Sequence, residues 1–306
     1  MRERQESAPC IEIGLLIRYI HSRFVTSFIG KSMMHRAKKS LGQNFLQDAN
    51  VAQKIVRVFD PKPGDSVVEI GPGKGALTTL LLQSLPHCTV IELDNELAPM
   101  LQEQFGEKIS VIHNDILNVS LTELRTQIGQ PLRLIGNIPY NITTPILFHV
   151  VDSLPAVKDF LVMMQTEVAQ RIVAKPRTKE YGILSILLQY FSTPKMQFAV
   201  SRNSFFPVPN VSSAILHLDF EHPFPHKATN EQLFRKIVRG TFGKRRKTLR
   251  NGLKGLDVPT EEFDRLSVDL ELRPEELSVA DFVKLSNELA HIAPQILNTA
   301  TEDADG

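Results

Sequence analysis

The amino-acid sequence predicts an α/β protein: a doubly wound, mainly parallel sheet followed by a small all-helical domain. Two observations support this prediction. From about residue 64 to 165, short runs rich in branched apolar side chains alternate with helical stretches, whereas beyond residue 230 only helical patterns remain. The short runs are apolar at almost every position, as expected for strands covered by helices on both faces of a sheet. At 306 residues, 42% of them hydrophobic, the chain can form one large domain and one small one.

The elements follow one another in a regular order. We expect five strands at 66–70, 88–93, 108–115, 131–136 and 157–165, with helices between them at 76–85, 95–105 and 143–151. Two later strands, at 195–200 and 212–220, are joined by a loop too short for a helical crossover, so they should pair antiparallel at one end of the sheet. Further helices are expected at 230–241, 245–253, 260–266 and 278–290.

Composition shifts along the chain predict its domains. The proline-rich stretch "EHPFPHKATN" (221–230) separates a sheet domain, residues 37–222, from a helical domain, residues 228–292. Residues 1–36 form an apolar extension that charged residues interrupt, so it is a poor membrane span. We expect this extension to be disordered or to arise from an upstream start codon, because Met33 and Met34 directly precede the basic "HRAKKS". Residues 293–306 should be a flexible tail.

Charge and cysteine content narrow the classes of protein. The net charge is only +1, which argues against a protein wholly dedicated to nucleic acid, although an average can hide a local patch. Cys10 and Cys88 are far apart and lack metal-ligand spacing, so we expect no disulfide framework, no metal site and a reducing compartment such as the cytoplasm.

A glycine loop and two acids mark a nucleoside site. The loop "GPGKG" (71–75) follows the first strand, and glycines such as Gly71 and Gly73 let the backbone approach a ligand closely. Glu92 ends the second strand, where a carboxylate can accept both ribose hydroxyls, and Asp115 ends the third. Ala76 stands where the dinucleotide fingerprint needs its third glycine, which favours S-adenosylmethionine over NAD but leaves both possible.

The stretch "GNIPYNIT" (136–143) ends the fourth strand, beside this nucleoside site. The Asn137 amide oxygen and the Ile138 carbonyl could accept the two protons of an aromatic amine and direct its lone pair at a methyl donor. Tyr140 offers a face on which a flipped base can stack, and Pro139 fixes the backbone between the two side chains. A second aromatic, Phe205 or Phe206 in "SFFPVPN" (204–210), could close the base from its other side.

A basic segment lies in the helical domain. The sequence "KRRKTLR" (244–250) carries five cations, and no acidic residue occurs between Gln232 and Leu256. We expect a contact with an RNA phosphate backbone from Lys244, Arg245, Arg246, Lys247 and Arg250, with Arg235, Lys236 and Arg239 on the preceding helix.

Together these motifs resemble the ribosomal RNA adenine dimethyltransferases, in particular their bacterial small-subunit branch. The matching stretches are "SLGQNFLQD" (40–48), "VEIGPGKGALT" (68–78), "VIELD" (90–94), "GNIPYNITTP" (136–145), "FFPVPNVSSA" (205–214) and "FGKRRKTLRNGL" (242–253). The resemblance implies a Rossmann-like class I S-adenosylmethionine-dependent methyltransferase sheet. It also implies dimethylation of N6 of two adjacent adenosines near the 3′ end of 16S rRNA in the small ribosomal subunit.

The resemblance also assigns residues to the cofactor site. By analogy, Asn44 and Leu46 close over the methionine end of the cofactor, and Gly71, Glu92, Asp115 and Asn137 complete the site. Two positions depart from the family pattern: Ile138 replaces a commoner leucine, and Asn210 replaces a frequent lysine, which puts one phosphate contact in doubt. The extension also has no counterpart in the family.

Three alternative interpretations stay open. A large-subunit dimethyltransferase would perform the same chemistry on 23S rRNA. An assembly factor would mainly bind immature small subunits, with a role in ribosome biogenesis that does not need methylation. An oxidoreductase would bind NADH in preference to S-adenosylmethionine. On each reading except the last we expect a monomer that acts on ribosomal RNA and has no membrane partner.

Overall fold

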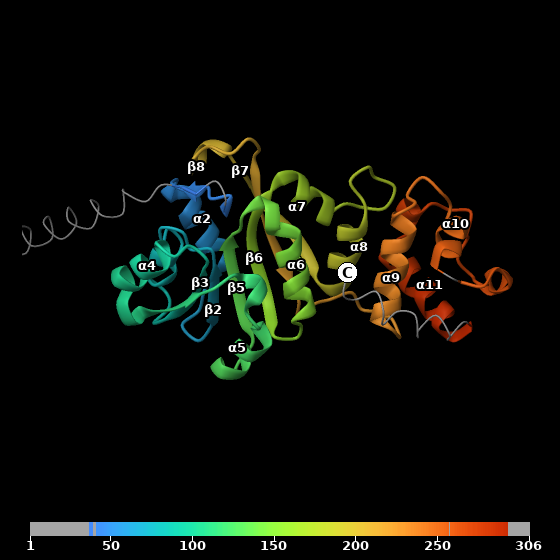
Figure 1. The fold of residues 1–306 in the computed structure, drawn as a ribbon, viewed down its shortest axis with the longest axis horizontal. Coiled ribbons are helices and arrows are strands. Elements are labelled where there is room, and N and C mark those ends of the chain that lie inside the picture. The colour runs from blue at the N-terminus through green and yellow to red at the C-terminus, as the bar shows by residue number, and fades with distance from the viewer. Residues whose placement is uncertain (1–36, 39–40, 257, 293–306) are drawn as a thin grey trace, which may run out of the picture.

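A computed structural model of the chain describes residues 37–38, 41–256 and 258–292. The predicted extension at 1–36 and the predicted tail at 293–306 lie outside these residues. Figure 1 shows a sheet flanked by helices, with the C-terminal helices side by side at one end of the molecule.

Seven strands form the main sheet, in the order β4-β3-β2-β5-β6-β9-β7. Its strands are β2 (Ser66–Ile70), β3 (Cys88–Glu92), β4 (Ile109–His113), β5 (Leu132–Asn137), β6 (Val157–Gln165), β7 (Thr193–Val200) and β9 (Ser213–Asp219). The five strands from β2 to β6 run parallel, and β9 pairs antiparallel with both β6 and β7. The predicted parallel sheet with an antiparallel pair at one end is therefore confirmed.

Helices lie between the strands and follow them. They are α2 (Ala49–Phe59), α3 (Thr78–Leu81), α4 (Leu97–Phe105), α5 (Leu121–Ile128), α6 (Thr143–Asp152), α7 (Thr166–Ile172), α8 (Ile183–Phe191), α9 (Glu231–Phe242), α10 (Leu249–Leu253) and α11 (Val279–Ile292). The helix predicted at 76–85 shortens to α3, and the one predicted at 260–266 is a 3₁₀ helix, Thr260–Arg265. Other short 3₁₀ turns occur at Gly106–Lys108, Ile116–Asn118, Tyr140–Ile142, Arg202–Ser204, Lys254–Leu256 and Pro274–Glu276.

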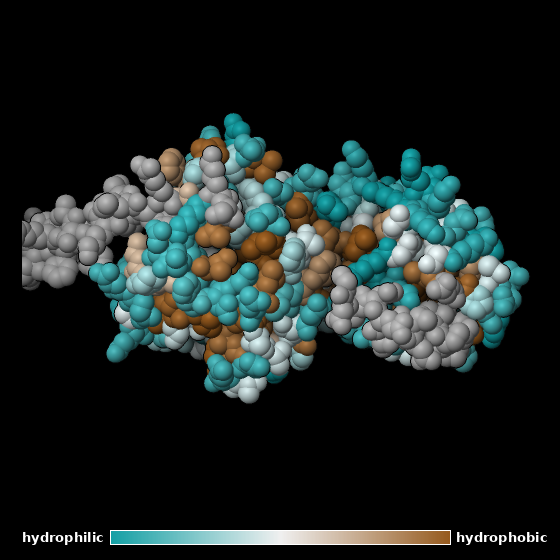
Figure 2. All heavy atoms as spheres, in the orientation of Figure 1, coloured by the Kyte–Doolittle hydropathy of each residue, from teal (hydrophilic) through white to brown (hydrophobic). Residues whose placement is uncertain are grey.

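A continuous apolar core joins the sheet to the C-terminal helices. Its link is α8, whose Tyr190 ring lies 4.4 Å from the Phe234 ring of α9, centroid to centroid. The Tyr190 hydroxyl also accepts a hydrogen bond from the Ala228 amide at 3.0 Å. The helical part thus packs directly on the sheet domain. In Figure 2 hydrophilic residues cover most of the face over α9 and α10.

A second, two-stranded sheet brings distant parts of the chain together above the glycine loop. The strand β1 (Phe45–Leu46) pairs antiparallel with β8 (Phe205–Phe206), so Phe45 lies opposite Phe206 and Leu46 opposite Phe205. The amide of Gln47 also donates to the Ser204 carbonyl at 2.9 Å. We call residues 41–47 the strap, because this pairing holds them across the carboxyl edge of the main sheet.

Candidate functional site

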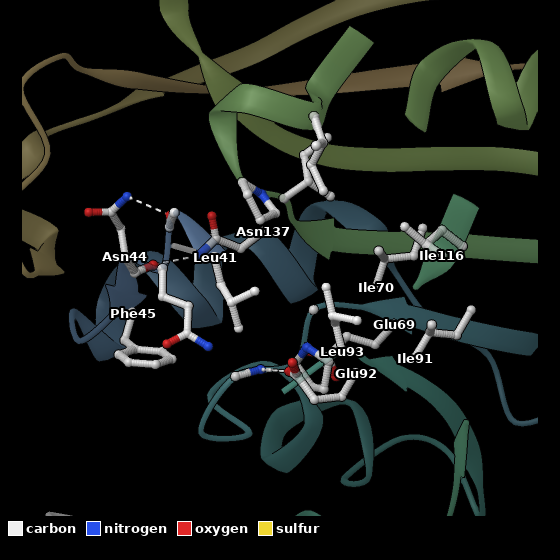
Figure 3. A pocket seen from close by; sticks show the side chains of 18 of the residues that line it. Leu41, Asn44, Phe45, Glu69, Ile70, Ile91, Glu92, Leu93, Ile116 and Asn137 are labelled. Carbon is white, nitrogen blue, oxygen red and sulfur yellow. Dashed lines mark hydrogen bonds between the residues drawn. The ribbon is translucent and has the colours of Figure 1, made fainter. Parts of the chain in front are cut away.

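A cavity of about 240 Å³ lies at the carboxyl ends of β2, β3 and β5. Its walls come from the strap, from the loop after β2, from the ends of β3 and β4, and from residues 137–142. Figure 3 shows Asn44 of the strap next to Asn137, to which its backbone is hydrogen-bonded, with Glu92 and Leu93 on another side of the cavity. In an open α/β sheet this edge is where ligands bind.

The glycine loop has a backbone that only glycine adopts readily. Gly71 and Gly73 have φ angles of 65° and 58°, in the left-handed region. A Cβ atom at Gly73 would lie 3.0 Å from the ring of Phe45, so a side chain there would push against the strap. Glycine at these two positions thus allows both the left-handed backbone and the close packing of the Phe45 ring against the loop.

Glu92 ends β3 with its carboxylate facing the loop. One oxygen accepts the Asp94 amide at 2.9 Å and the other accepts the Gly73 amide at 3.2 Å. Each carboxylate oxygen has a further lone pair with which it can accept a ligand hydroxyl. Burial raises the pKa of Glu92, and the two backbone donors partly offset that effect. The half-buried Asp115 also lines the cavity, and its carboxylate accepts the Leu117 amide at 3.0 Å.

Sequence reasoning missed Glu69, which lines the same cavity from the end of β2. Its carboxyl is 1% exposed and accepts a hydrogen bond from the Thr78 hydroxyl at 2.6 Å. Burial raises its pKa to about 7, and the nearby Glu92 charge acts in the same direction. An acidic residue inside an otherwise apolar strand, "SVVEI", was the available signal.

The strap is fastened at one end by a cluster of charges that the sequence did not reveal. The Lys38 ammonium lies 2.7 Å from the Asp94 carboxylate, and the Gln43 amide donates to the same carboxylate at 2.8 Å. Partial burial alone would raise the pKa of Asp94, but these donors and the Glu96 amide outweigh it and lower the pKa to about 2. The carboxylate that holds the strap is therefore ionised at neutral pH.

The strap carries Asn44 and Leu46 to the cavity, as the family resemblance implied. Both residues line the cavity. Leu46 is buried in an apolar cluster, separate from the core described above, that includes Ile55 and Phe59 of α2. The backbone carbonyl of Asn44 accepts a hydrogen bond from the side-chain amide of Asn137 at 3.0 Å (Figure 3). The strap and the end of β5 are therefore directly bonded.

This bond orients the Asn137 amide. Because the amide nitrogen donates a hydrogen bond to the Asn44 carbonyl, the amide oxygen is left to accept a hydrogen bond from a ligand. Ile138, Pro139 and Tyr140 follow Asn137 along the same wall of the cavity. The half-buried Tyr140 ring is fixed by a hydrogen bond of 2.6 Å between its hydroxyl and that of Ser213.

The predicted second aromatic face differs from the structure. Phe205 is 2% exposed and is not among the residues that line the cavity. It packs inward with Leu46 because opposite residues of β1 and β8 share a face. The adjacent Phe206 is 60% exposed. Phe205 therefore offers no free ring face to a base in this structure.

The five predicted RNA-contacting cations have different surroundings. Lys244, Arg246 and Lys247 are exposed on the turn between α9 and α10. Arg245 instead bonds the Glu275 carboxylate at 2.6 Å and the Lys179 carbonyl at 2.9 Å. Arg250 pairs with Glu271 at 3.0 Å. Arg250 therefore joins two segments of the helical region, and Arg245 also joins this region to the segment that precedes α8.

No cluster of three or more potential metal-ligating side chains occurs among the described residues. No helix in this part of the chain is long and apolar enough to cross a membrane.

Comparisons with known proteins match this geometry. The model of the family described as "Ribosomal RNA adenine dimethylase" matches residues 34–291. A ribosomal RNA small subunit methyltransferase A from Acinetobacter baylyi is 45% identical over 257 residues, which cover 83% of this chain and 93% of that protein. A dimethyladenosine transferase structure from Plasmodium falciparum superposes with a TM-score of 0.69 at 25% identity, covering 81% of this chain and 98% of that one. The structure of the 23S rRNA methyltransferase ErmE gives 0.62 at 25% identity, covering 80% and 99%.

The cavity has the groups that S-adenosylmethionine requires. The glycine loop lets a ligand approach its backbone closely, and the Glu92 carboxylate has free lone pairs for ribose hydroxyls. Asp115, Asn44 and Leu46 also line the cavity. The matching family region covers the strap, the sheet and the C-terminal helices together. The chain belongs to the ribosomal RNA adenine dimethylase family, with S-adenosylmethionine as its cofactor.

Proposed function

We propose that this protein dimethylates N6 of two adjacent adenosines near the 3′ end of 16S rRNA, within the small ribosomal subunit. The observation that carries the proposal is the bond from the Asn137 amide nitrogen to the strap, since it leaves the amide oxygen of a cavity-lining residue, close to Tyr140 in the same wall, to accept a hydrogen bond from a ligand. Relatives 40–45% identical to this chain are named small subunit methyltransferases, which favours 16S over 23S rRNA.

S-adenosylmethionine supplies an electrophilic methyl group on a sulfonium sulfur. The Asn137 oxygen and the Ile138 carbonyl would accept hydrogen bonds from the two N–H groups of the adenine amine, which localises the nitrogen lone pair. As that lone pair forms the new N–C bond, the bond between the methyl carbon and the sulfonium sulfur would break and leave its electron pair on a neutral thioether. The excess amine proton would then pass to water, because neither acceptor is a strong base. One N–H remains after the first transfer, so the same acceptors can orient the second.

Tyr140 holds the extruded base. Its ring is positioned by the hydroxyl bond to Ser213, so it can stack on adenine without losing further conformational entropy. The cofactor site and the base site then meet at Asn137, which closes one wall of both.

Binding of the whole subunit would involve the helical region. Exposed Lys244, Arg246 and Lys247 can contact phosphates, while Arg245 and Arg250 shape the surface through their ion pairs. We propose that the chain acts as a monomer in the cytoplasm and that binding to the small subunit also serves ribosome biogenesis.

Methyl transfer to purified ribosomal subunits tests the function. With radiolabelled cofactor and small subunits that lack dimethyladenosine, we expect labelled N6,N6-dimethyladenosine at two adjacent positions of 16S rRNA. Label found only in 23S rRNA, or no label, would refute the proposal. Asn137→Ala and Asn137→Asp should lower the rate at least ~100-fold, because the first removes the acceptor and the second sets a carboxylate against the Asn44 carbonyl.

A matched control and a binding assay separate this from the assembly-factor alternative. Asn118→Ala, at an exposed asparagine outside the cavity, should retain the wild-type rate. Asn137→Ala should still bind small subunits with unchanged affinity. A variant that methylates normally would show that Asn137 is not a catalytic residue, and the proposed orientation of the amine would be wrong.

A further inference from the structure

Three of the exposed large hydrophobic residues lie on one short loop. Phe206, at the end of β8, and Val208 and Val211, in the loop that follows, are 60%, 53% and 43% exposed, and all three lie within a stretch of six residues. Single exposed apolar side chains are common, but three on one projecting loop form a patch. In Figure 2 hydrophobic residues stand out at the upper edge, where Figure 1 places β8 and the loop beyond it.

The strand register relates Phe206 to the glycine loop. Directly opposite residues of an antiparallel pair project to the same face. Phe206 lies opposite Phe45, whose ring lies 3.0 Å from the place of a Cβ on Gly73, whereas Phe205 lies opposite Leu46 and is buried with it in one apolar cluster. Phe206 therefore projects to the same face of the β1–β8 pair as the Phe45 ring, which packs against the glycine loop beside the cavity.

The loop is held at both ends. Its beginning is paired with β1, and its end at Ser213 is bonded to the Tyr140 hydroxyl at 2.6 Å. Pro207 and Pro209 restrict the backbone between these points. The apolar side chains thus project from a preorganised segment whose far end lies beside the ring proposed to stack on the target base.

The chemistry of the loop fits nucleobases. From Ser201 to Ser213 the chain has no acidic residue and carries Arg202, so nothing in this stretch repels a polyanion. An adenosine can reach Asn137 only by leaving its stack, and this uncovers the face of a neighbouring base. Aromatic and apolar side chains stack on or wedge against such faces in nucleic-acid complexes.

We propose that residues 206–211 form an apolar finger for the bases that flank the target adenosine, with Phe206 stacking on the base uncovered when the adenosine is extruded. This inference rests on the proposed function, because it specifies how the same site receives its RNA. The finger holds the RNA open, and Asn137 and Tyr140 act on the base that has left the stack.

Methylation kinetics on small subunits test the finger. Phe206→Ala should lower kcat/KM for the subunit roughly 10- to 100-fold, as expected for the loss of one base–aromatic stack. Phe206→Trp should stay within about threefold of wild type, since its ring retains the stacking face. Ile128→Ala, at another exposed hydrophobic residue on α5, should leave kcat/KM unchanged.

Two further readouts exclude a merely structural role. Because the Phe206 ring is exposed, the melting temperature and the S-adenosylmethionine Kd of Phe206→Ala should equal those of wild type. The finger would be overturned if Phe206→Ala had the kcat/KM of wild type, or if its affinity for S-adenosylmethionine fell in proportion to its activity. Either result would leave the proposed function intact. A wild-type protein that does not methylate small subunits would overturn both.

Discussion

Replacing Glu69 by glutamine should make the fold less sensitive to alkaline pH. The carboxyl lies at the end of β2, 1% exposed, with the Thr78 hydroxyl as its side-chain donor. Burial raises its pKa from 4.5 to about 7, so near neutral pH the folded protein holds a proton that the unfolded chain has released. Glutamine has a similar shape and can still accept from Thr78, but it cannot ionise.

The magnitude follows from proton linkage. A carboxyl whose folded pKa exceeds its unfolded pKa contributes stability that is fully present below pH 4.5 and is lost as the pH rises through about 7. With 1.36 kcal/mol for each pKa unit, the wild type loses about 3 kcal/mol of unfolding free energy from this group between these limits. Glu69→Gln should lose none of it, so the difference between variant and wild type should grow in favour of the variant.

Urea unfolding at a series of pH values from 5 to 8.5 measures this difference. Other titrating groups act equally in both proteins, so they cancel when the two free energies are subtracted. Glu167→Gln, at an exposed glutamate, serves as the control and should differ from wild type by no more than about 0.5 kcal/mol at any pH. A constant difference for Glu69→Gln would refute the reasoning, and one that falls with pH would mean that the site stabilises the ionised carboxylate.

Two substitutions in the sheet should destabilise the fold for different reasons. Arg133→Met should lower the unfolding free energy by about 3–5 kcal/mol, since it leaves the buried Asp159 carboxylate without the bidentate bonds of 2.8 and 2.9 Å that now neutralise it. An effect below about 1 kcal/mol in urea unfolding would count against this account. Gly136→Ala should cost about 1–3 kcal/mol, because its Cβ would lie 2.6 Å from the Ile70 carbonyl oxygen. Gly64→Ala, where a Cβ meets nothing within 4 Å, is the matched control. Equal melting temperatures for the two glycine variants would contradict the steric argument.

The strands were predictable because their signal is local. Each central strand is buried on both faces, so its run of branched apolar residues is visible without knowledge of its neighbours. The same pattern predicts where each strand ends, so it also placed strand-end residues such as Glu92 and Asn137 at the carboxyl edge of the sheet. The strand "PLRLIG" could be located in this way, but the role of Arg133 within it could not, since its partners Asp65 and Asp159 lie in other elements.

Other features depend on contacts between distant segments. The helix α8 reads "ILSILLQYF", apolar on nearly every side, because it is enclosed between the sheet and the C-terminal helices. Only Ser185 and Gln189, one helical turn apart, interrupt the apolar run, and we did not predict this helix. Asn44 reached the cofactor site in our prediction only through family resemblance, because the strap's position depends on pairing with β8.

The strap connects the two halves of the proposed site. Asp94 accepts hydrogen bonds from Lys38 and from Gln43 of the strap through its carboxylate, while its own amide donates to Glu92. The next strap residue, Asn44, accepts the side-chain amide of Asn137 through its backbone carbonyl. The same short segment therefore contacts both the loop that carries the proposed ribose acceptor and the amide proposed to orient the target amine. Because both contacts would be lost if the strap moved away, the proposed function predicts that the amine acceptor is oriented only while the cofactor cavity is enclosed.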